Sequence, residues 1–361
     1  MEKILLIYGG RSVEHDISII TALQAYNAIK NDYEILPIYI TRTGKPMTAD
    51  NLDDVNIYAD FEALSKNAKQ VLFCLGEGKV KIKSKLRSHY FTPTCALVCN
   101  HGTDGEDGAM SALLKLCRIP ATCPDMASSA CCMDKAICKD ILKSNNLPVV
   151  DFISLSQVQI KEVEKKFNYP IIVKPSRSGS SVGIERCNNQ FQLKNAIETA
   201  KFFDKKLIFE PFIENGREFN CAVLFKNGKH VASKVCEVKS KGIYSFDKKY
   251  LAEKPSSTFK LEKSVIKLVQ DLSIKAAQVL ECKGVVRVDF LMDESGNLFI
   301  NEINTIPGSL AFYLFSSMRE ICVELIEEAK ICFKESDLSY NYASDALQVF
   351  ASSNMNNYAK K

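Results

Sequence analysis

The sequence has no long hydrophobic run and no large excess of charge of either sign. The apolar run nearest the N-terminus, residues Ile4–Tyr8, is far too short for a signal peptide or a membrane span. Lysine and arginine number 47 and aspartate and glutamate 43, so the net charge is +4. This small charge is spread without long blocks, which argues against a nucleic-acid-binding surface. We therefore expect a cytoplasmic protein that binds neither membranes nor nucleic acid.

The sequence also lacks any C-x-x-C pair, although it contains 14 cysteines. This absence argues against a zinc ribbon or a thioredoxin-type site. Several cysteines lie in apolar runs, among them Cys74, Cys99, Cys221 and Cys332. A thiol in such a run behaves as a small core hydrophobe. We expect the cysteines to be reduced.

The composition and length fit a multidomain globular protein. The chain has 361 residues, of which 46% are hydrophobic and 25% charged, and this length suggests two or three domains. Short apolar runs between helical patterns in residues 2–125 favour a parallel sheet covered on both faces. A helix is expected at 18–30. The lysine-rich stretch 41–87 is expected to be an inserted surface excursion. The expected strands are Lys3–Tyr8, Tyr33–Ile40, Gln70–Cys74 and Ala96–Cys99.

The second part of the chain has a different pattern. A helix is expected over 126–141, with Met133–Lys135 inside it, and the clearest amphipathic helix over 262–281. The tail from residue 335 is rich in serine and asparagine, with order expected only through 347–350. The expected strands, which include an antiparallel meander and a final hairpin, are Tyr169–Val173, Leu207–Glu210, Glu218–Phe225, His230–Val238, Gly284–Met292 and Leu298–Asn304.

Three oxygen-bearing side chains are expected to meet on the final hairpin. Glu302 and Asn304 are two residues apart on one strand and project from one face, and Asp289 lies on the partner strand within cross-strand reach. Such hard ligands suit Mg²⁺ held together with substrate phosphates. The alternative is a solvated polar sheet face.

A glycine- and serine-rich turn follows an apolar strand at Lys174–Gly183. Backbone N–H groups and hydroxyls in such a turn can bind phosphate oxygens, and the lysine that leads into it favours this interpretation. The turn lacks the Gly-Lys-Ser/Thr ending of a Walker A loop. A flexible hairpin tip is the alternative.

Two further segments are expected at the mouth of the first sheet. Gly9 and Gly10 end the first strand, where α/β sheets bind ligands, and Glu14 could pair there with an ammonium group. The loop His101–Gly108 follows the fourth strand at the same edge. Capping of a helix by Ser12 and Glu14, and an ordinary turn at His101–Gly108, are the alternatives.

Taken together, these segments resemble the D-alanine–D-alanine ligase family of ATP-grasp enzymes. The resemblance spans about residues 2–330. It depends on the motifs Gly9-Gly10…Glu14, His101-Gly…Glu106-Asp-Gly, Met133-Asp-Lys, Lys174-Pro-Ser…Gly-Ser-Ser-Val-Gly, Arg287-Val-Asp-Phe and Glu302-Ile-Asn-Thr-Ile-Pro-Gly308.

The resemblance implies an α/β (α+β) protein with the ATP-grasp fold. A Rossmann-like N-terminal domain with a parallel sheet would cover residues 1–123, and a small central subdomain 124–215. A catalytic subdomain with a largely antiparallel sheet would cover 216–334, followed by a polar tail, 335–361.

The resemblance also implies an activity. The family joins two D-alanines for peptidoglycan synthesis, using ATP and an acyl-phosphate intermediate. It uses two Mg²⁺ ions, with Mn²⁺ as a substitute, and is typically a cytoplasmic homodimer.

Residue roles follow from the same resemblance. Lys135, Lys174, Ser180, Ser181, Glu210, Phe212, Ile213, Glu218 and Lys249 match ATP-binding positions. Asp289, Glu302 and Asn304 match the metal ligands. Glu14, His101, Arg287, Gly308 and Tyr313 match substrate contacts, and Glu14, Ser180, Arg287, Lys249 and Tyr250 the catalytic set. Lys249 and Tyr250 lie in a stretch that resembles the family's lid loop.

The sequence departs from the family at two positions. Phe246 replaces a lid tyrosine, and Tyr313 replaces the serine that binds the acceptor's carboxylate, which leaves the acceptor open between D-alanine and D-serine. A D-lactate acceptor is disfavoured, because those enzymes carry a histidine where Tyr250 stands. A different ATP-grasp amino-acid ligase and a catalytically silent nucleotide-binding module are the remaining alternatives.

Overall fold

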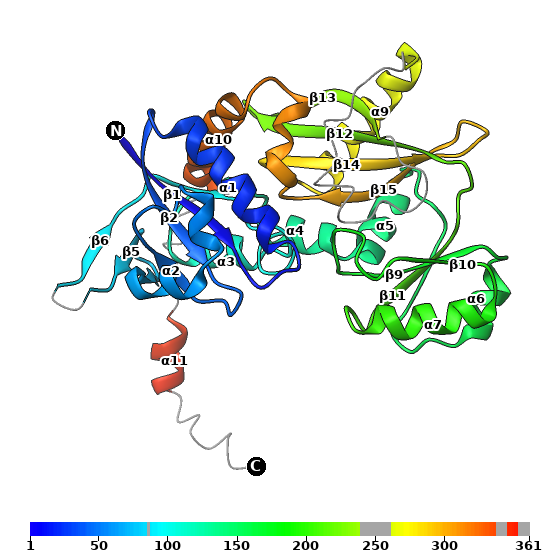
Figure 1. The fold of residues 1–361 in the computed structure, drawn as a ribbon, viewed down its shortest axis with the longest axis horizontal. Coiled ribbons are helices and arrows are strands. Elements are labelled where there is room, and N and C mark those ends of the chain that lie inside the picture. The colour runs from blue at the N-terminus through cyan, green and yellow to red at the C-terminus, as the bar shows by residue number, and fades with distance from the viewer. Residues whose placement is uncertain (85–86, 239–260, 337–344, 353–361) are drawn as a thin grey trace.

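Three β-sheets, each drawn from a separate part of the chain, organise the molecule (Figure 1). The computed structural model describes residues 1–84, 87–238, 261–336 and 345–352. The strands of each sheet fall within one of the three expected domain ranges. Among the described residues, no helix is both long and apolar enough to cross a membrane.

The N-terminal sheet is parallel only among the last three strands at one edge. Its seven strands have the order β6-β5-β4-β3-β2-β1-β7, in which β1 pairs in parallel with β2 and β7. The pairings from β2 through β6 are antiparallel. The strands are β1 (Glu2–Gly9), β2 (Tyr33–Ile40), β3 (Pro46–Thr48), β4 (Lys69–Cys74), β5 (Lys79–Ile82), β6 (His89–Phe91) and β7 (Cys95–Val98).

This arrangement corrects two expectations. The stretch 41–87 is not an inserted surface excursion, because β3, β4 and β5 extend the sheet. The strand expected at Gln70–Cys74 is antiparallel to its neighbours and lies far from β7 in the sheet order. An apolar run indicates a strand but not its direction. The sequence pattern therefore could not distinguish a parallel from an antiparallel strand at Gln70–Cys74.

Helices pack around the N-terminal sheet. They are α1 (His15–Ile29), η1 (Val55–Tyr58), α2 (Phe61–Asn67) and α3 (Ala109–Leu116). Strand β1 is buried over residues 4–9, and α1 packs against it through a buried face that includes Ile19, Ala22 and Ala25. The apolar run that predicted the first strand therefore forms the centre of the core.

The central sheet is small and antiparallel, with the order β10-β9-β11-β8. Its strands are β8 (Ile153–Leu155), β9 (Ile171–Pro175), β10 (Glu185–Cys187) and β11 (Leu207–Pro211), accompanied by helices α6 (Ile160–Lys166) and α7 (Gln190–Lys201). Val173, Leu193 and Phe209 belong to its own hydrophobic cluster.

The C-terminal sheet is also antiparallel, with the order β13-β12-β14-β15. Its strands are β12 (Arg217–Lys226), β13 (Lys229–Val238), β14 (Val285–Met292) and β15 (Leu298–Asn304), and helix α9 (Lys263–Val279) packs on it. Val269, Ala276 and the partly buried Leu272 of the predicted apolar stripe join this core.

The single helix expected over 126–141 is wrong. Asp134, with φ −85° and ψ 99°, separates α4 (Met126–Met133) from α5 (Lys135–Ser144). Its carboxylate accepts hydrogen bonds from the backbone N–H groups of Ala136 and Ile137, so it caps α5. The break makes Lys135 the first residue of a helix.

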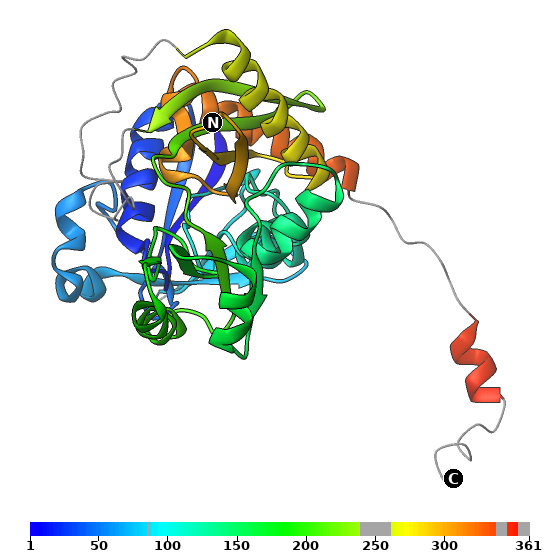
Figure 2. The same ribbon diagram turned by 90° about the vertical axis from the view of Figure 1, so that its right-hand side faces the viewer.

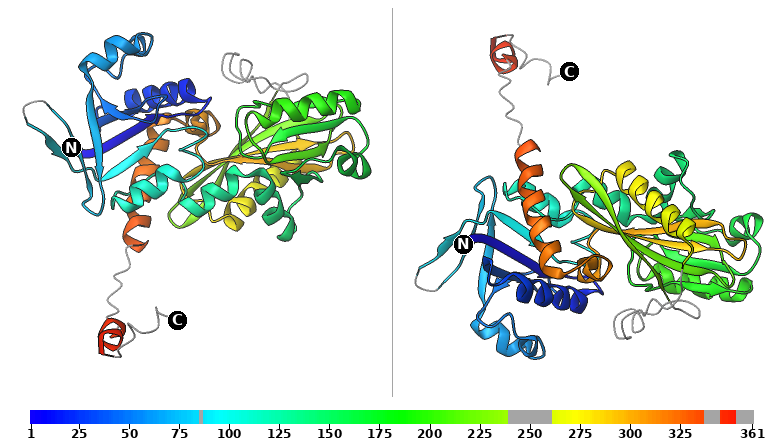
Figure 3. Two further views of the ribbon diagram at one scale, coloured as in Figure 1. Left: turned by 90° about the horizontal axis from the view of Figure 1, so that it is seen from below. Right: turned by 90° about the horizontal axis from the view of Figure 1, so that it is seen from above.

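The C-terminal elements return to the N-terminal sheet. After η2 (Gly308–Leu314), helix α10 (Met318–Ser336) packs its buried residues, among them Ile321, Leu325 and Ile326, into the core that also contains Ile4. Figure 3 shows α10 beside the N-terminal sheet. The last described helix, α11 (Ala346–Ser352), is longer than the 347–350 expected and projects away from the body (Figures 1 and 2).

Candidate active site

Strands β14 and β15 bring four predicted residues into cross-strand pairs. Asp289 lies opposite Glu302, and Arg287 lies opposite Asn304. The Arg287 guanidinium donates two hydrogen bonds to the Asp289 carboxylate, at 2.6 and 2.7 Å, and Asn304 Nδ2 donates to Asp289 Oδ2 at 3.1 Å. The prediction that these side chains gather on one sheet face is confirmed.

An irregularity in β15 lies beside this quartet. Phe290 pairs with Ile300 and Asp289 pairs with Glu302, so Asn301 is an extra residue of a β-bulge. Asn301 Oδ1 accepts a hydrogen bond of 3.2 Å from Lys174 Nζ on β9. The bulge therefore connects the C-terminal sheet to the central sheet.

Both predicted phosphate-binding lysines lie at this junction. Lys135 Nζ is 3.4 Å from Glu302 Oε2 and donates to the Ser178 carbonyl at 2.7 Å. Lys174 Nζ is 2.7 Å from Glu210 Oε2. Burial disfavours the charged form of Glu210, but neighbouring lysines outweigh it and leave the Glu210 pKa below its ordinary value. Lys135 thus faces a carboxylate of the C-terminal sheet, and Lys174 faces a carboxylate of the central sheet.

The glycine- and serine-rich turn reaches the N-terminal domain. Ser180 Oγ donates a hydrogen bond to Glu14 Oε1, and both side chains are buried. A Cβ atom at Gly179 would lie 2.7 Å from Glu14 Oε2, so a larger residue there would displace the Glu14 carboxylate. Ser180 and Ser181 have positive φ angles of 52° and 58°, which aligns the turn against Glu14.

A second contact joins the His101 loop to the segment that follows β15. His101 Nδ1 lies 2.6 Å from the Ile306 carbonyl oxygen, and its Nε2 lies 2.8 Å from Thr21 Oγ1. Glu106 accepts hydrogen bonds from the backbone N–H groups of Ile306 and Gly102, at 3.1 and 3.2 Å. The predicted donor-substrate and acceptor-substrate segments are therefore held together.

Burial perturbs both titratable groups of this contact. Burial lowers the pKa of His101, which favours its neutral form. Burial, with the nearby Glu14 carboxylate, raises the pKa of Glu106 to about 8. A pKa shift as large as that of Glu106 is typical of functional sites.

A polar network supports the turn and Lys135 from behind. Asp134 Oδ1 accepts from Ser176 Oγ at 2.7 Å, and both Asp134 oxygens accept from Lys206 Nζ at 2.9 Å. Asp204 accepts two hydrogen bonds from the Arg177 guanidinium, at 3.0 and 2.6 Å. The base of the turn is therefore fixed to Asp134, the N-cap of α5.

The remaining predicted residues occupy more peripheral positions. Phe212 and Ile213 follow β11 and are half-buried, and the Arg186 guanidinium lies 4.2 Å from the Phe212 ring centre. Glu218 lies on β12 opposite Leu291.

Two predicted substrate contacts lie on the segment after β15. Gly308 begins η2, and Tyr313 on the same element is 43% exposed, with its ring 6.3 Å from that of Phe312. Lys249, Tyr250 and Phe246 lie outside the described residues.

The oxygen donors on β14 and β15 fit a hard divalent cation. Asp289 and Glu302 offer carboxylates and Asn304 an amide oxygen, which is the ligand chemistry of Mg²⁺. Within the described ranges, no group of three or more His, Cys, Asp or Glu side chains could hold a metal ion, so the set depends on the amide as its third ligand.

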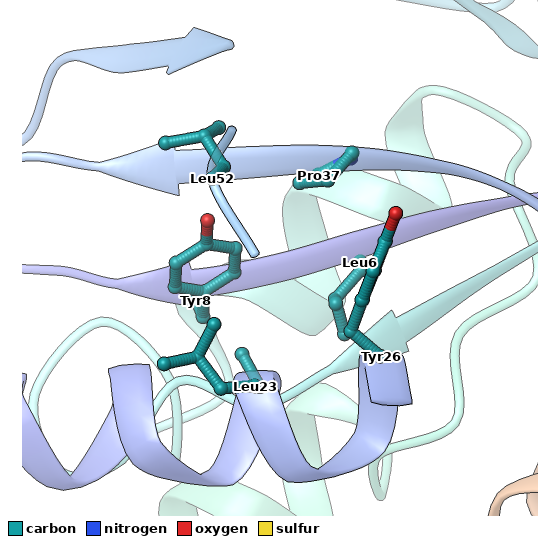
Figure 4. Close-up of a pocket in the computed structure, with 7 residues that line it drawn as sticks. Leu6, Tyr8, Leu23, Tyr26, Pro37 and Leu52 are labelled. Atoms are coloured by element: carbon teal, nitrogen blue, oxygen red, sulfur yellow. The ribbon is translucent and has the colours of Figure 1, made fainter. Parts of the chain in front are cut away.

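An apolar crevice lies elsewhere, between β1, β2 and α1 (Figure 4). It is too narrow for a water molecule and is lined by side chains that include Leu6, Leu23 and Leu52. It contains none of the predicted site residues, so we regard it as a packing defect of the N-terminal core.

Sequence reasoning assigned no role to three residues of this site. Glu106 belongs to the motif His101-Gly…Glu106-Asp-Gly, and its position in a glycine-rich turn is a signal for a functional residue. Lys139 is one helical turn after Lys135, yet the side chain of Lys139 is only 1% exposed. Asn301 interrupts the alternation between Ile300 and Ile303, which signals a bulge.

Two buried lysines between two antiparallel sheets, beside an α/β domain, give this chain the architecture of the ATP-grasp class. Family models for the D-ala D-ala ligase N-terminus and C-terminus match residues 3–124 and 141–322. The chain therefore belongs to the D-alanine–D-alanine ligase family, whose ligation depends on ATP.

Relatives and solved structures agree with this membership. The chain is 37% identical to the D-alanine–D-alanine ligase of Thermosipho africanus over 87% of its own length and 88% of the relative's. It is 32% identical to that of Staphylococcus saprophyticus, covering 88% and 90%. The Coxiella burnetii D-alanine–D-alanine ligase superposes with a TM-score of 0.79 at 27% identity, covering 100% and 99% of the two chains. The VanG D-Ala:D-Ser ligase of Enterococcus faecalis gives 0.77 at 27%, covering 91% and 99%.

Proposed function

We propose that this protein joins two D-alanines into D-alanyl-D-alanine for peptidoglycan synthesis, with ATP as the energy source. The first carboxylate attacks the γ-phosphorus of ATP, and ADP leaves. The amine of the second D-alanine then attacks the acyl carbon, phosphate leaves and the amine loses a proton.

The contact between Ser180 and Glu14 carries this proposal. It joins the phosphate-binding turn, which follows Lys174, to the carboxylate proposed to bind the ammonium of the first D-alanine. A nucleotide-binding module would need the turn and the lysines but not a buried carboxylate from another domain. The contact therefore favours phosphate transfer to an amine-bearing acid over nucleotide binding alone.

The residues of this chain divide the work between binding and charge stabilisation. Lys135 and Lys174 hold the ATP phosphates, and Glu14, positioned by Ser180, orients the first D-alanine. Arg287 presents a planar fork of donors that stabilises negative charge on the acyl phosphate and on the tetrahedral oxyanion. The backbone N–H of Gly308 adds a donor for the second substrate.

The carboxylates and amide of β14 and β15 would hold Mg²⁺, as two ions on the family's pattern, with Mn²⁺ as a substitute. The donor set Asp289, Glu302 and Asn304 fits this cation because all three offer oxygen ligands. Bound there, the metal would neutralise charge on phosphate oxygens. A cytoplasmic homodimer, and the domain limits at residues 123, 215 and 334, belong to the same proposal.

The decisive experiment measures phosphate release with ATP and Mg²⁺ in the presence of D-alanine, D-serine, D-lactate or L-alanine, with each product identified by mass. We expect release with D-alanine alone and a product of the mass of D-alanyl-D-alanine. Absence of phosphate release with every D-substrate would overturn the proposal.

A D-serine acceptor is the second candidate. Tyr313 departs from the family's serine, and a solved D-Ala:D-Ser ligase is among the similar structures. When D-alanine and D-serine are supplied together in the same assay, a mixed D-alanine–D-serine product formed in preference to D-alanyl-D-alanine would select this candidate.

A further inference from the structure

Lys139 is a buried cation that the proposed reaction does not use. It lies on α5, one turn after Lys135, and its side chain is 1% exposed. Its Nζ is 2.6 Å from Glu210 Oε1 and 5.8 Å from the centre of the Phe152 ring. Burying an ammonium group is costly unless a carboxylate compensates it, so a lysine at this position needs a reason.

Glu210 is shared between two lysines. Its Oε1 faces Lys139, and its Oε2 is 2.7 Å from Lys174 Nζ, which also donates to Asn301. The side chains of all three charged residues are at most 5% exposed. Two ammonium groups and one carboxylate leave this buried triad with a charge of +1.

Burial and the charge of Lys174 lower the pKa of Lys139, while Glu210 opposes them. An excess positive charge in a region of low dielectric favours a nearby anion strongly. The triad lies beside Lys135 and the phosphate-binding turn, where the anion would be a polyphosphate.

We propose that Lys139 is a positioning residue for the nucleotide: by sharing Glu210, it leaves Lys174 with uncompensated positive charge for the ATP phosphates. Without Lys139, the remaining pair of Lys174 and Glu210 would be neutral. The inference rests on the proposed function only in taking ATP as the nucleotide.

The test compares Lys139→Met with Lys139→Arg, which keeps the charge of +1. Lys143→Met, on the exposed face of the same helix, is the matched control. Isothermal titration calorimetry with Mg²⁺ and a β,γ-imido analogue of ATP measures affinity without D-alanine or turnover, and adenosine serves as a probe without phosphate.

We expect Lys139→Met to weaken the analogue about tenfold, because one unit charge is lost several ångströms from the phosphates. Lys139→Arg should keep affinity within about threefold of the parent chain by the same charge argument. Adenosine affinity should change less than twofold in either variant, since adenosine carries no charge.

Unchanged analogue affinity in Lys139→Met, even with a lower melting temperature, would assign Lys139 a purely structural role and overturn the proposal. An equal loss for adenosine and the analogue, or an equal loss for Lys139→Arg and Lys139→Met, would overturn it as well. If Lys139→Met does not fold, Lys139→Gln, which also removes the charge but keeps a hydrogen-bond donor for Glu210, takes its place with the same expected loss. Because no ligation is measured, a protein that fails to join D-alanines can still confirm this inference.

Discussion

Glu302 offers a change of charge without a change of volume. Its side chain faces Lys135 at 3.4 Å and pairs with Asp289 across the strands. We expect Glu302→Gln to lower turnover about 100-fold or more, because the proposed metal loses an anionic ligand. Its melting temperature should stay within a few degrees of the parent, since the packing volume is kept. Phosphate release and thermal unfolding measure the two effects.

The control for this change is Glu294→Gln. Glu294 is an exposed residue in the turn between β14 and β15 and accepts a hydrogen bond from Asn215 at 2.5 Å. It should leave turnover unchanged. Substantial ligation by a folded Glu302→Gln protein would rule out the metal assignment.

Glu106 gives a prediction on the pH dependence of stability. Burial raises its pKa from 4.5 to about 8. Between these values the folded protein keeps a proton that the unfolded chain releases. The stabilising contribution of the neutral carboxyl is therefore present below pH 4.5 and is lost as the pH rises through about 8. The slope is about 1.4 kcal/mol per pH unit for one proton.

Glu106→Gln removes this titration. We expect the variant to be about 1–3 kcal/mol less stable at pH 6, because an amide oxygen can serve only one of two backbone N–H groups. Because the parent loses about 1.4 kcal/mol per pH unit between pH 6 and its pKa of about 8, the difference should vanish or change sign by pH 9. Urea unfolding at pH 6, 7.5 and 9 measures it. A constant difference across this range would show that Glu106 does not titrate there.

The sequence predicts the residue types of a motif but not the contacts between distant segments. Hairpin geometry fixes cross-strand neighbours, so the grouping of Arg287, Asp289, Glu302 and Asn304 could be predicted. The contact of Glu106 with Ile306 spans 200 residues of sequence, and no local pattern encodes it.

At the level of elements, Asp134 does more than end a helix. It caps α5 through Ala136 and Ile137, and it accepts hydrogen bonds from Ser176 and Lys206. We expect Asp134→Ala to cost about 2–4 kcal/mol of unfolding free energy, since the cap and the partners of a buried network are lost together. Urea unfolding at pH 7 gives the value.

Asp125→Ala is the matched control, because Asp125 caps the neighbouring helix α4 through Ser128 at 2.9 Å. Its loss should cost about 1 kcal/mol, the ordinary value of a cap. Equal losses for the two variants would contradict a supporting role for the Asp134 network.

Elements with a strong local pattern agreed well with the sequence prediction. The strands at Tyr33–Ile40 and Leu298–Asn304 have the predicted limits. The break at Asp134 was missed, because apolar spacing continues across it and only its side-chain hydrogen bonds reveal the cap. The direction of β4 was missed because strand direction depends on tertiary pairing.

At the level of the whole molecule, the position of a helix along the chain does not decide which core it packs into. Helix α10 lies in the range expected for the C-terminal subdomain, yet its apolar face completes the core around β1 and α1. Arg319 donates two hydrogen bonds to Asp32, at 2.8 and 2.9 Å, and Lys330 lies 2.9 Å from Glu2. Amphipathic spacing predicts a buried face but not the surface that covers it.

This arrangement separates two truncations. A chain that ends at residue 317 loses α10, and with it the buried Ile321, Leu325 and Ile326. Each such side chain contributes about 1.5–3 kcal/mol on burial, and a domain has only about 5–15 kcal/mol in total. We therefore expect this chain to be insoluble or to lack a cooperative transition, although β14 and β15 are intact.

A chain that ends at residue 336 keeps α10 and loses α11, which projects from the body (Figure 1). It should melt within about 2 °C of the full chain and turn over at the same rate, since the core side chains that the structure describes all lie before residue 337. Calorimetry and phosphate release on both chains test the pair, and a cooperative, active chain ending at 317 would show that the N-terminal core does not need α10.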